Sequence, residues 1–304
     1  MNAIDLFAGA GGFSTGAQMA GCRVVWAANH WQSAVDVHAA NHPGAEHACQ
    51  DLHQARWDQV PAHDLLLASP CCQGHSKARG KLSGNPQHDA SRSTAWAVVS
   101  AIEHHRPAFA VVENVPEFLA WALYPAWRAA MEALGYCLSP HVVDAADHGV
   151  PQHRSRLFIV AVRGNRPLML NLRKQAHVPA STFIDFGAGK WSTVEKVGRA
   201  GATLSRIAAG RLIHGERFIS SYYGSEKGGR SLNRPVGTIT TRDRHAIIRG
   251  DQMRMLSAQE CRAAMRFPVD YVLPSQHKLA VHLLGNAVAP PVARDVINAL
   301  KEAA

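Results

Sequence analysis

The sequence lacks several features that mark special classes of protein. Its six cysteines form no C-x-x-C pair, which argues against a four-thiolate zinc site, and no metal site is expected. No run of about 18 apolar residues occurs, so neither a transmembrane helix nor a membrane partner is expected. The first residues do not resemble a signal peptide, so the expected location is the cytoplasm.

Charged residues are also scarce, at 18% of the chain, and they form no long acidic or basic tail. The hydrophobic fraction of 47% can bury a full core in 304 residues, as one large domain or as a large and a small one. The 32 Lys and Arg residues outnumber the 23 Asp and Glu residues, which gives a net charge of +9. This surplus favours a polyanionic partner, although a basic surface without such a role explains it equally well.

The first half of the chain alternates between short apolar runs and helical patterns. The predicted strands are 3–7, 22–28, 64–68, 109–112, 136–143 and 156–162, and the predicted helices are 14–20, 33–40, 94–105 and 117–134. The last of these helices is interrupted at Pro125. Such alternation predicts a doubly wound α/β sheet with helices on both faces.

This alternation ends after Arg163. Residues 164–237 are rich in Gly, Arg, Ser and Lys without a clear period, and a second, smaller domain is expected from about Asn171. Helical patterns return at 257–266 and 292–301. We therefore expect a first domain formed by residues 1–170 and 266–304, and a second formed by residues 171–265.

Glycines follow the first predicted strand, in the segment DLFAGAGGF (5–13). Glycines let the backbone approach a ligand closely, and the helix that follows favours polar or anionic groups at its N-terminus. The spacing differs from G-x-G-x-x-G, which argues against a nicotinamide dinucleotide. A tight turn without a ligand is the alternative, but the carboxyl end of a strand in an open sheet is where a cofactor is expected.

Two adjacent cysteines, Cys71 and Cys72, follow the third predicted strand in the segment SPCCQGHS (69–76). A thiol on such a loop lies where the active sites of α/β sheets collect. Buried cysteines are the alternative, but Pro, Gln, Gly and His make a poor core. The fourth predicted strand runs into Glu113 and Asn114, where an acid and an amide suit either a functional site or the start of a helix.

Read together, these segments resemble the DNA cytosine-5 methyltransferases. The segments that match, in the family's own order, are DLFAGAGGF, PCCQGHS, VVENV, PQHRSRLF, LSAQECRAAMRFPVDY (256–271) and LLGNAVAPPVA (283–293). The resemblance covers residues 1 to about 163 and 234–304. It implies a Rossmann-like, S-adenosylmethionine-dependent methyltransferase sheet in the first domain and a target-recognition function for the second.

The resemblance implies an enzyme that methylates double-stranded DNA at a specific sequence, in the cytoplasm in association with the nucleoid. It acts either alone or as the protective half of a restriction pair, with a cognate restriction endonuclease as partner. Two alternatives stay open: methylation of tRNA, which one branch of the family performs, and a catalytically silent DNA-binding regulator. The length of the segment between the motifs favours DNA over RNA, and the presence of Cys72, Glu113 and Arg156 disfavours the silent regulator.

Catalytic roles follow from the same resemblance. The family's nucleophile lies in the pattern Pro-Cys-Gln, but here Cys71 stands in the place of that proline. Cys72 is assigned as nucleophile because it directly precedes Gln73, and Cys71 remains its rival. The nucleophile adds to carbon 6 of a flipped-out cytosine. The other implied catalytic residues are Glu113 at ring nitrogen 3, Asn114, which holds the loop, and Arg156, which with Arg154 acting through it binds the cytosine oxygen and orients Glu113.

The implied cofactor is S-adenosylmethionine, the methyl donor. Many relatives bind the donor ribose with an acid after the second strand, where this chain has Asn29 followed by His30. Asp51 matches the acid that reads the adenine amino group. The remaining residues implied at the donor site are Phe7, Ala8, Gly9, Gly11, Gly12, Phe13, Leu52, Pro70, Asn286 and Ala287.

Basic and glycine residues after the proposed nucleophile predict a loop that closes on DNA, with a plain flexible loop as the alternative. The DNA-binding candidates there are Gln73, Ser76, Lys77, Arg79, Lys81 and Arg92. The candidates in the second domain are Tyr222, Tyr223, Arg230, Thr240, Arg242 and Arg244. Their arginines meet guanine edges or only phosphates, and the sequence does not separate the two.

Overall fold

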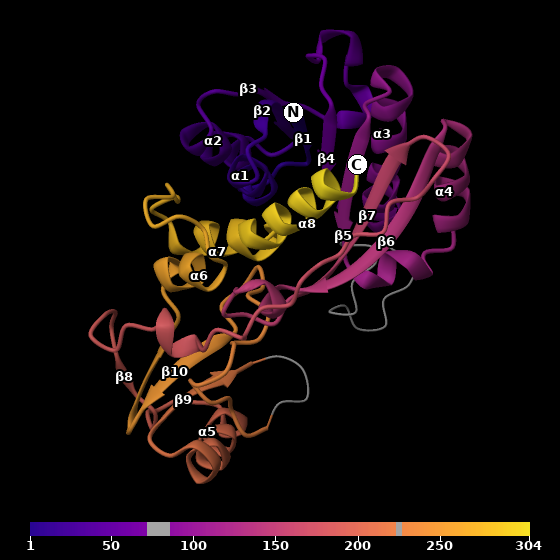
Figure 1. Ribbon diagram of the computed structural model, residues 1–304. Coiled ribbons are helices and arrows are strands. Elements are labelled where there is room, and N and C mark those ends of the chain that lie inside the picture. The colour runs from indigo at the N-terminus through magenta and orange to yellow at the C-terminus, as the bar shows by residue number, and fades with distance from the viewer. Residues whose placement is uncertain (72–85, 223–226) are drawn as a thin grey trace. The chain divides into compact units, whose positions relative to one another are not determined.

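The computed structural model describes residues 1–71, 86–222 and 227–304, with the side chains of residues 86–93 also left out. The chain divides into two compact units (Figure 1). The first unit comprises Met1–Asp144, Ser155–Arg173 and Ala287–Ala304, and the second comprises Ala145–Arg154 and Lys174–Asn286. The second unit thus includes 145–154 and 266–286, which the sequence analysis assigned to the first domain. The functions assigned to the two domains stay predictions.

The first unit is built on a seven-stranded sheet in the order β3-β2-β1-β4-β5-β7-β6. Its strands are β1 (Asn2–Leu6), β2 (Arg23–Asn29), β3 (Glu46–Cys49), β4 (Leu65–Ala68), β5 (Phe109–Asn114), β6 (Tyr136–Asp144) and β7 (Ser155–Arg163). Strands β1 to β5 pair in parallel, whereas β7 pairs antiparallel with β5 and β6. The order reverses between β1 and β4, and open α/β sheets bind ligands at the carboxyl ends of strands at such a point.

Helices cover both faces of this sheet. They are α1 (Gly12–Met19), α2 (Gln32–Asn41), α3 (Pro86–His105), α4 (Tyr124–Ala133) and α8 (Pro290–Ala303), with short 3₁₀ turns η1 (Leu52–Gln54), η2 (Trp57–Gln59) and η3 (Pro116–Ala120). Ile4 and Leu6 belong to the apolar cluster that α3 and α4 complete. Side chains alternate along a strand, so Asp5 points to the opposite face, where it contacts α1. The predicted α/β class is confirmed.

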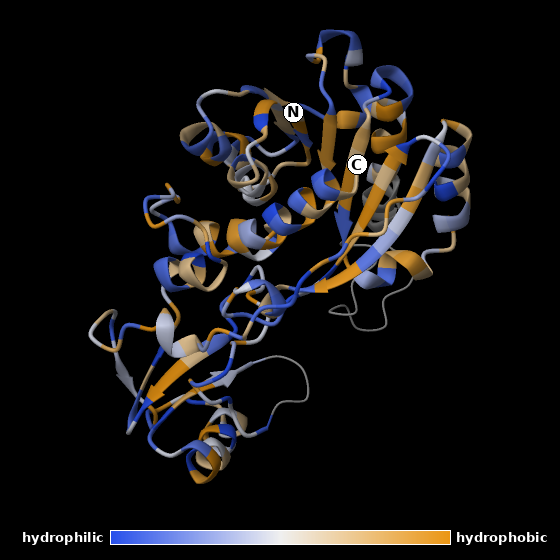
Figure 2. Ribbon diagram, in the orientation of Figure 1, coloured by the Kyte–Doolittle hydropathy of each residue, from blue (hydrophilic) through white to orange (hydrophobic). Residues whose placement is uncertain are grey.

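Burial explains why these strands were readable in the sequence. The four residues of β4 are all buried, as are the interior positions of β5 and β7. Strands buried on both faces form continuous apolar runs, which colour as hydrophobic in Figure 2. On the other face, α1 and α8 pack so closely that a side chain on Gly16 would meet Ala293 and the backbone of Pro290.

The second unit contains a four-stranded antiparallel sheet in the order β8-β11-β10-β9. Its elements are η4 (Ala145–His148), η5 (Ala180–Thr182), β8 (Ser192–Thr193), α5 (Gly201–His214), β9 (Arg217–Ser221), β10 (His245–Arg249), β11 (Gln252–Met255), α6 (Ala258–Ala264) and α7 (His277–Asn286). Helix α5 packs on β9, with Gly210 against the ring of Phe218. Apart from α6, the sequence analysis predicted none of these elements.

A buried ion pair joins β11 to α6 in the second unit. Both guanidinium Nη atoms of Arg254 donate to the Glu260 carboxylate at 2.7 Å, and the two side chains are 3% and 5% exposed. Glu260 also accepts the Ser257 amide in a capping box at the start of α6. Trp191 covers the Arg254 guanidinium, 5.0 Å from the ring centre.

Candidate active site

An acid and an arginine meet at the carboxyl end of β5 in the first unit. Glu113 pairs with Phe158 of β7, so its side chain emerges on the same face as Phe158 and, two residues away, Arg156. Arg156 Nε lies 3.2 Å from Glu113 Oε1, and the two side chains are 19% and 9% exposed. The structure thus brings together two residues that the sequence analysis assigned to catalysis.

A hydrogen bond connects Asn114, the residue after this acid, to the loop after β4. Asn114 Nδ2 donates to the carbonyl of Pro70 at 3.1 Å, while Asn114 Oδ1 accepts the Val115 amide at 2.9 Å. Cys71 is half-buried, and its amide donates to Thr94 Oγ1 at 3.0 Å. Cys72 lies outside the described residues. So do Gln73, Ser76, Lys77, Arg79 and Lys81, and the side chain of Arg92.

The glycine segment after β1 forms a tight turn that leads into α1. Phe7, Gly9 and Gly11 have φ angles of 60°, 56° and 82°, the left-handed region that a non-glycine residue such as Phe7 rarely occupies. Gly11 is the N-cap of α1 and offers no side chain to the helix. Gly12 and Phe13 are buried, and their amides have no hydrogen-bond partner among the described residues. Buried amides of this kind suit the anionic end of a ligand.

Asp5 is a buried carboxylate beneath this turn that the sequence analysis did not single out. Its Oδ2 accepts the Ser14 amide at 3.1 Å and the Ser14 hydroxyl at 2.7 Å. Burial raises the pKa of Asp5 to about 7, although both bonds from Ser14 oppose that shift. An acid within an apolar strand was the available signal in the sequence.

Most of the remaining donor-site candidates of the first unit lie at the end of β2 or follow β2, β3 or β4, whereas Ala8 follows β1 and Ala287 precedes α8. Asn29 pairs with Cys49 in register, is buried, and accepts the Trp31 amide at 3.0 Å through Oδ1. Asp51 is exposed at the start of η1, where Oδ1 accepts the His53 amide at 3.0 Å. The other candidates are Ala8, which is half-buried, His30, which is exposed, and Leu52, Pro70 and Ala287, which are buried.

Arg154 and Asn286 belong to the second unit. Arg154 is 3% exposed and donates to the carbonyls of Ile239 at 3.1 Å and Gly285 at 3.0 Å. Asn286 is exposed at the end of α7. Gln152, which the sequence analysis missed, accepts the Ile239 amide at 2.7 Å. The predicted role of Arg154 at the cytosine oxygen stays a prediction.

The described DNA-binding candidates of the second unit surround the start of β10. Tyr222 is half-buried, with the Arg206 guanidinium 5.3 Å from its ring centre, and its amide donates to the Arg244 carbonyl. Thr240 Oγ1 donates to the Arg242 carbonyl at 2.9 Å, and Arg242 itself is exposed. Arg230 is half-buried and pairs with Ile219 through the backbone, and Tyr223 lies outside the described residues.

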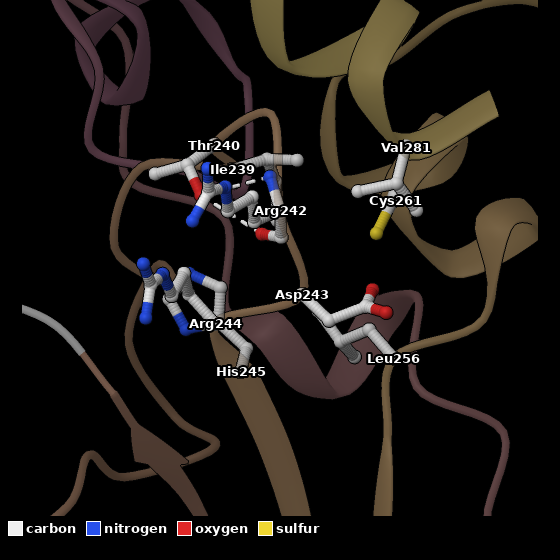
Figure 3. Close-up of a pocket in the computed structure, with 9 residues that line it drawn as sticks. All are labelled: Ile239, Thr240, Arg242, Asp243, Arg244, His245, Leu256, Cys261 and Val281. Carbon is white, nitrogen blue, oxygen red and sulfur yellow. Dashed lines mark hydrogen bonds between the residues drawn. The ribbon is translucent and has the colours of Figure 1, made fainter. Parts of the chain in front are cut away.

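A small pocket lies among these residues (Figure 3). Its lining residues are Ile239, Thr240, Arg242, Asp243, Arg244, His245, Leu256, Cys261 and Val281. Its volume of about 10 Å³ is no more than one water molecule needs, which is too small for a cofactor. Burial raises the pKa of the Cys261 thiol strongly, which makes it a poor nucleophile.

Two kinds of site are missing from the part of the chain that the structure describes. No group of three or more His, Cys, Asp or Glu side chains is placed to hold a metal ion there. Nor does that part contain a helix with the length and apolar surface needed to cross a membrane.

The fold defines the class of protein. The chain superposes on the S. pombe Dnmt2 methyltransferase with a TM-score of 0.70 at 16% identity, covering 99% of this chain and 98% of that one. A DNMT2 variant from Spodoptera frugiperda gives a TM-score of 0.73 at 17% identity, with 99% of both chains covered. At such low identity these likenesses show the fold alone, an α/β sheet with helices on both faces.

The sequence comparisons then give the family. The family model for C-5 cytosine-specific DNA methylase matches residues 1–302. The type II methyltransferase M.HgiDI of Herpetosiphon aurantiacus is 28% identical over 95% of this chain and 90% of its own length. M1.HphI of Haemophilus parahaemolyticus is 26% identical over 98% and 86%. The chain belongs to the C-5 cytosine-specific DNA methylases and is a DNA cytosine-5 methyltransferase.

Proposed function

We propose that this enzyme transfers a methyl group from S-adenosylmethionine to carbon 5 of a cytosine within a specific double-stranded DNA sequence, with Cys72 as nucleophile. The hydrogen bond from Asn114 to Pro70 is the observation that supports this most directly. Pro70 is two residues before Cys72, and Glu113 directly precedes Asn114. This bond therefore holds Pro70, at the start of the loop after β4, next to the end of β5 that carries Glu113.

The thiol and the acid have complementary tasks. Carbon 5 of cytosine is a weak nucleophile until another group adds to carbon 6. The Cys72 thiolate forms that bond, and Glu113 gives or shares a proton at ring nitrogen 3 as the ring gains electrons. Carbon 5 then takes the methyl group. When carbon 5 loses its proton to solvent, the bond between sulfur and carbon 6 breaks, the thiolate leaves, and ring nitrogen 3 returns its proton to Glu113.

Arg156 orients the acid and meets the cytosine oxygen. A guanidinium presents several N–H donors in one plane, so it can bind Glu113 and a second acceptor together. The target cytosine must leave the duplex to reach these groups. Oriented acid–base and hydrogen-bonding groups of this kind typically contribute about 10²- to 10⁴-fold each.

The turn after β1 fits the polar end of the donor. S-adenosylmethionine, when bound, supplies an electrophilic methyl group. The unbonded amides of Gly12 and Phe13 would hold its carboxylate, and the left-handed turn at Gly9 and Gly11 allows the close approach. Asp51 would accept the adenine amino group and Asn29 would bond the ribose. Asn286 and Ala287 would complete the site.

The second unit is proposed to recognise the target sequence. Its exposed Arg242, on a turn held by Thr240, supports this role. The type II methyltransferases among the relatives support a protective role beside a cognate restriction endonuclease. Action on chromosomal DNA would place the enzyme at the nucleoid.

Transfer of labelled methyl groups tests the proposal. We expect incorporation into duplex DNA and none into tRNA, and conversion sequencing of DNA from expressing cells should show one methylated motif. Cys72→Ser should abolish incorporation, because an alcohol is a far weaker nucleophile than a thiolate. Incorporation into tRNA alone would contradict the proposed substrate.

The neighbouring thiol provides the matched control. Cys71→Ser should retain most of the activity, because its amide rather than its thiol makes the bond to Thr94. A duplex with 5-fluorocytosine should trap a covalent complex, since fluorine cannot leave carbon 5 as a proton does. Trapping that survives in Cys72→Ala and disappears in Cys71→Ala would make Cys71 the nucleophile.

A further inference from the structure

Three histidines gather behind the turn that is proposed to bind the donor. His38 lies in α2, His42 directly follows that helix, and His47 lies in β3. The rings of His38 and His42 are 4.4 Å apart, and those of His38 and His47 are 5.0 Å apart. The sequence analysis gave these residues no role.

His38 extends the hydrogen bonds of Asp5 into a chain. Ser14 Oγ, which donates to Asp5, lies 2.9 Å from His38 Nε2, and His38 Nδ1 lies 2.8 Å from His47 Nε2. Asp5, Ser14 and His38 are all at most 1% exposed. The chain of hydrogen bonds therefore runs from β1, through the first turn of α1, to α2 and β3.

The state of His38 sets the direction of each bond. Burial, with His42 and His47 nearby, holds the pKa of His38 well below its usual value, so the ring is neutral and carries one proton. When Asp5 is ionised, Ser14 donates its only hydroxyl proton to the carboxylate and must accept from His38 Nε2–H. His38 Nδ1 is then bare and accepts from His47 Nε2–H. One tautomer of His38 satisfies the whole chain.

Ser14 is the residue through which this chain reaches the turn. It is the third residue of α1, and its amide is one of the first-turn donors that a side chain at the N-cap normally accepts. Gly11 has no side chain, so Asp5 accepts that amide from below. The next residue is held in a similar way: Thr15 Oγ1 donates to the Gly11 carbonyl at 2.7 Å and lies 3.3 Å from His42 Nε2.

We propose that His38 is a positioning residue for the methyl-donor site. Acting through Ser14 and Asp5, it fixes the first turn of α1 so that the amides of Gly12 and Phe13 face the donor in one conformation. The inference rests on the proposed donor site. Loss of the His38 bond leaves Ser14 Oγ without its donor and lets the turn adopt other conformations, which weakens donor binding without changing the chemical step.

Calorimetric titration of the full chain with S-adenosylhomocysteine, the product of the donor, tests this inference. His38→Leu should raise the dissociation constant by about tenfold, the usual effect of one lost buried hydrogen bond. His38→Gln should recover binding to within about threefold of wild type, because its amide can donate to Ser14. In methyl transfer, the KM for the donor should rise with the dissociation constant, whereas kcat at saturating donor should stay unchanged.

His63→Leu is the matched control. His63 is another half-buried histidine of the first unit with a lowered pKa, and its Nδ1 contacts the carbonyl of Pro61. Its contacts are with Pro61 and His105 and not with the turn, so its replacement should leave donor affinity at the wild-type value. Should His38→Leu fail to fold, Ser14→Ala removes the same link and should weaken binding to a similar degree.

NMR of the histidine ring nitrogens tests the proposed hydrogen-bond chain directly, because it shows which nitrogen of His38 carries the proton. Ring nitrogen NMR shifts at pH 8.5 should show His38 neutral and protonated at Nε2. Folded His38→Leu and Ser14→Ala proteins that bind as tightly as wild type, or a His38 protonated at Nδ1, would overturn the inference. A wild-type protein that binds no S-adenosylhomocysteine and methylates nothing would instead overturn the proposed function.

Discussion

Buried charged side chains serve different purposes in the two units: the second unit buries two arginines and Glu260, whereas the first buries two acids. Among the described residues, the buried arginines, Arg154 and Arg254, lie in the second unit, and both bond to carbonyl or carboxylate groups that hold its loops. The first unit buries Asp5 and Glu113, both at the carboxyl ends of strands. Buried charge thus supports folding in the second unit, whereas in the first it lies beside the proposed chemistry. Net charge alone would not separate these uses.

The largest effect should come from the buried acid at the end of β5. Glu113→Gln keeps the shape of the side chain but can neither carry nor give the proton at ring nitrogen 3, so kcat should fall by about 10²- to 10⁴-fold. Single-turnover methylation at saturating donor and DNA measures it. Glu132→Gln, at an exposed ion pair with Arg128, should leave kcat unchanged. A Glu113→Gln enzyme with wild-type kcat would show that the buried acid of the first unit does not serve the chemistry.

The buried arginine of β11 tests whether buried charge stabilises the second unit. Arg254→Met leaves the Glu260 carboxylate buried without its partner, so unfolding of the second unit should become easier by about 3–5 kcal/mol. Urea denaturation and hydrogen exchange in β10 and β11 measure this change. Arg56→Met breaks only an exposed pair with Asp58 and should have no measurable effect. If Arg254→Met is equally silent, the second unit does not depend on its buried charge.

Asp5 should make the stability of the first unit depend on pH. Its pKa of about 7 in the folded protein exceeds the ordinary value of 3.8, so between these values the folded state holds a proton that the unfolded state has lost. Stability from this group therefore falls as pH rises from 4 to 7, by up to about 1.4 kcal/mol per pH unit, and is level above that. Asp5→Asn lacks this proton, so its free energy of unfolding relative to wild type should increase as pH rises from 4 to 7.

The buried histidines act in the opposite direction. The pKa of His42 in the folded protein is about 4, below its ordinary value of 6.5, so this group destabilises the fold as pH falls from 6.5 to 4. It is present in wild type and in Asp5→Asn, so it cancels in their difference. Urea denaturation of both proteins at pH 4.5, 6 and 8 gives that difference. An equal gain at all three pH values would show that Asp5 does not titrate in this range.

The sequence revealed the first unit more fully than the second for a physical reason. Strands buried on both faces, such as β4, form unbroken apolar runs that are easily detected in the sequence. In the second unit β8 has only two residues, the four residues of β11 include the polar Gln252 and Arg254, and the buried residues of α5 are Ile207 and Gly210. Short strands and a largely exposed helix leave little periodicity to detect.

The candidate site shows the same limit at the level of single residues. Motif order led to Glu113 and Arg156, and the register of β5 against β7 places them 3.2 Å apart. Nothing local in the sequence indicated that Ser14 lies between Asp5 and His38, because these residues come from three different elements. Contacts of that kind depend on the packing of α1 and α2 on the sheet, which residue patterns do not encode.

The smallest expected effect separates an arginine that contacts DNA from one that supports the fold. Arg242 is exposed on its turn, whereas Arg211 of α5 donates to the Gly250 carbonyl and the Asp251 carboxylate at 2.8 Å. Arg242→Ala should weaken DNA binding and, if it contacts a phosphate, reduce the slope of log affinity against log salt by about 1. Arg211→Ala should leave that slope unchanged. Fluorescence anisotropy with a duplex of the methylated motif, from about 50 to 200 mM salt, measures both.

An equal loss of slope in the two variants would mean that arginines of the second unit serve the fold and the DNA alike. A hydrogen bond from an arginine to a backbone carbonyl would then no longer distinguish an arginine that supports the fold from one that contacts DNA.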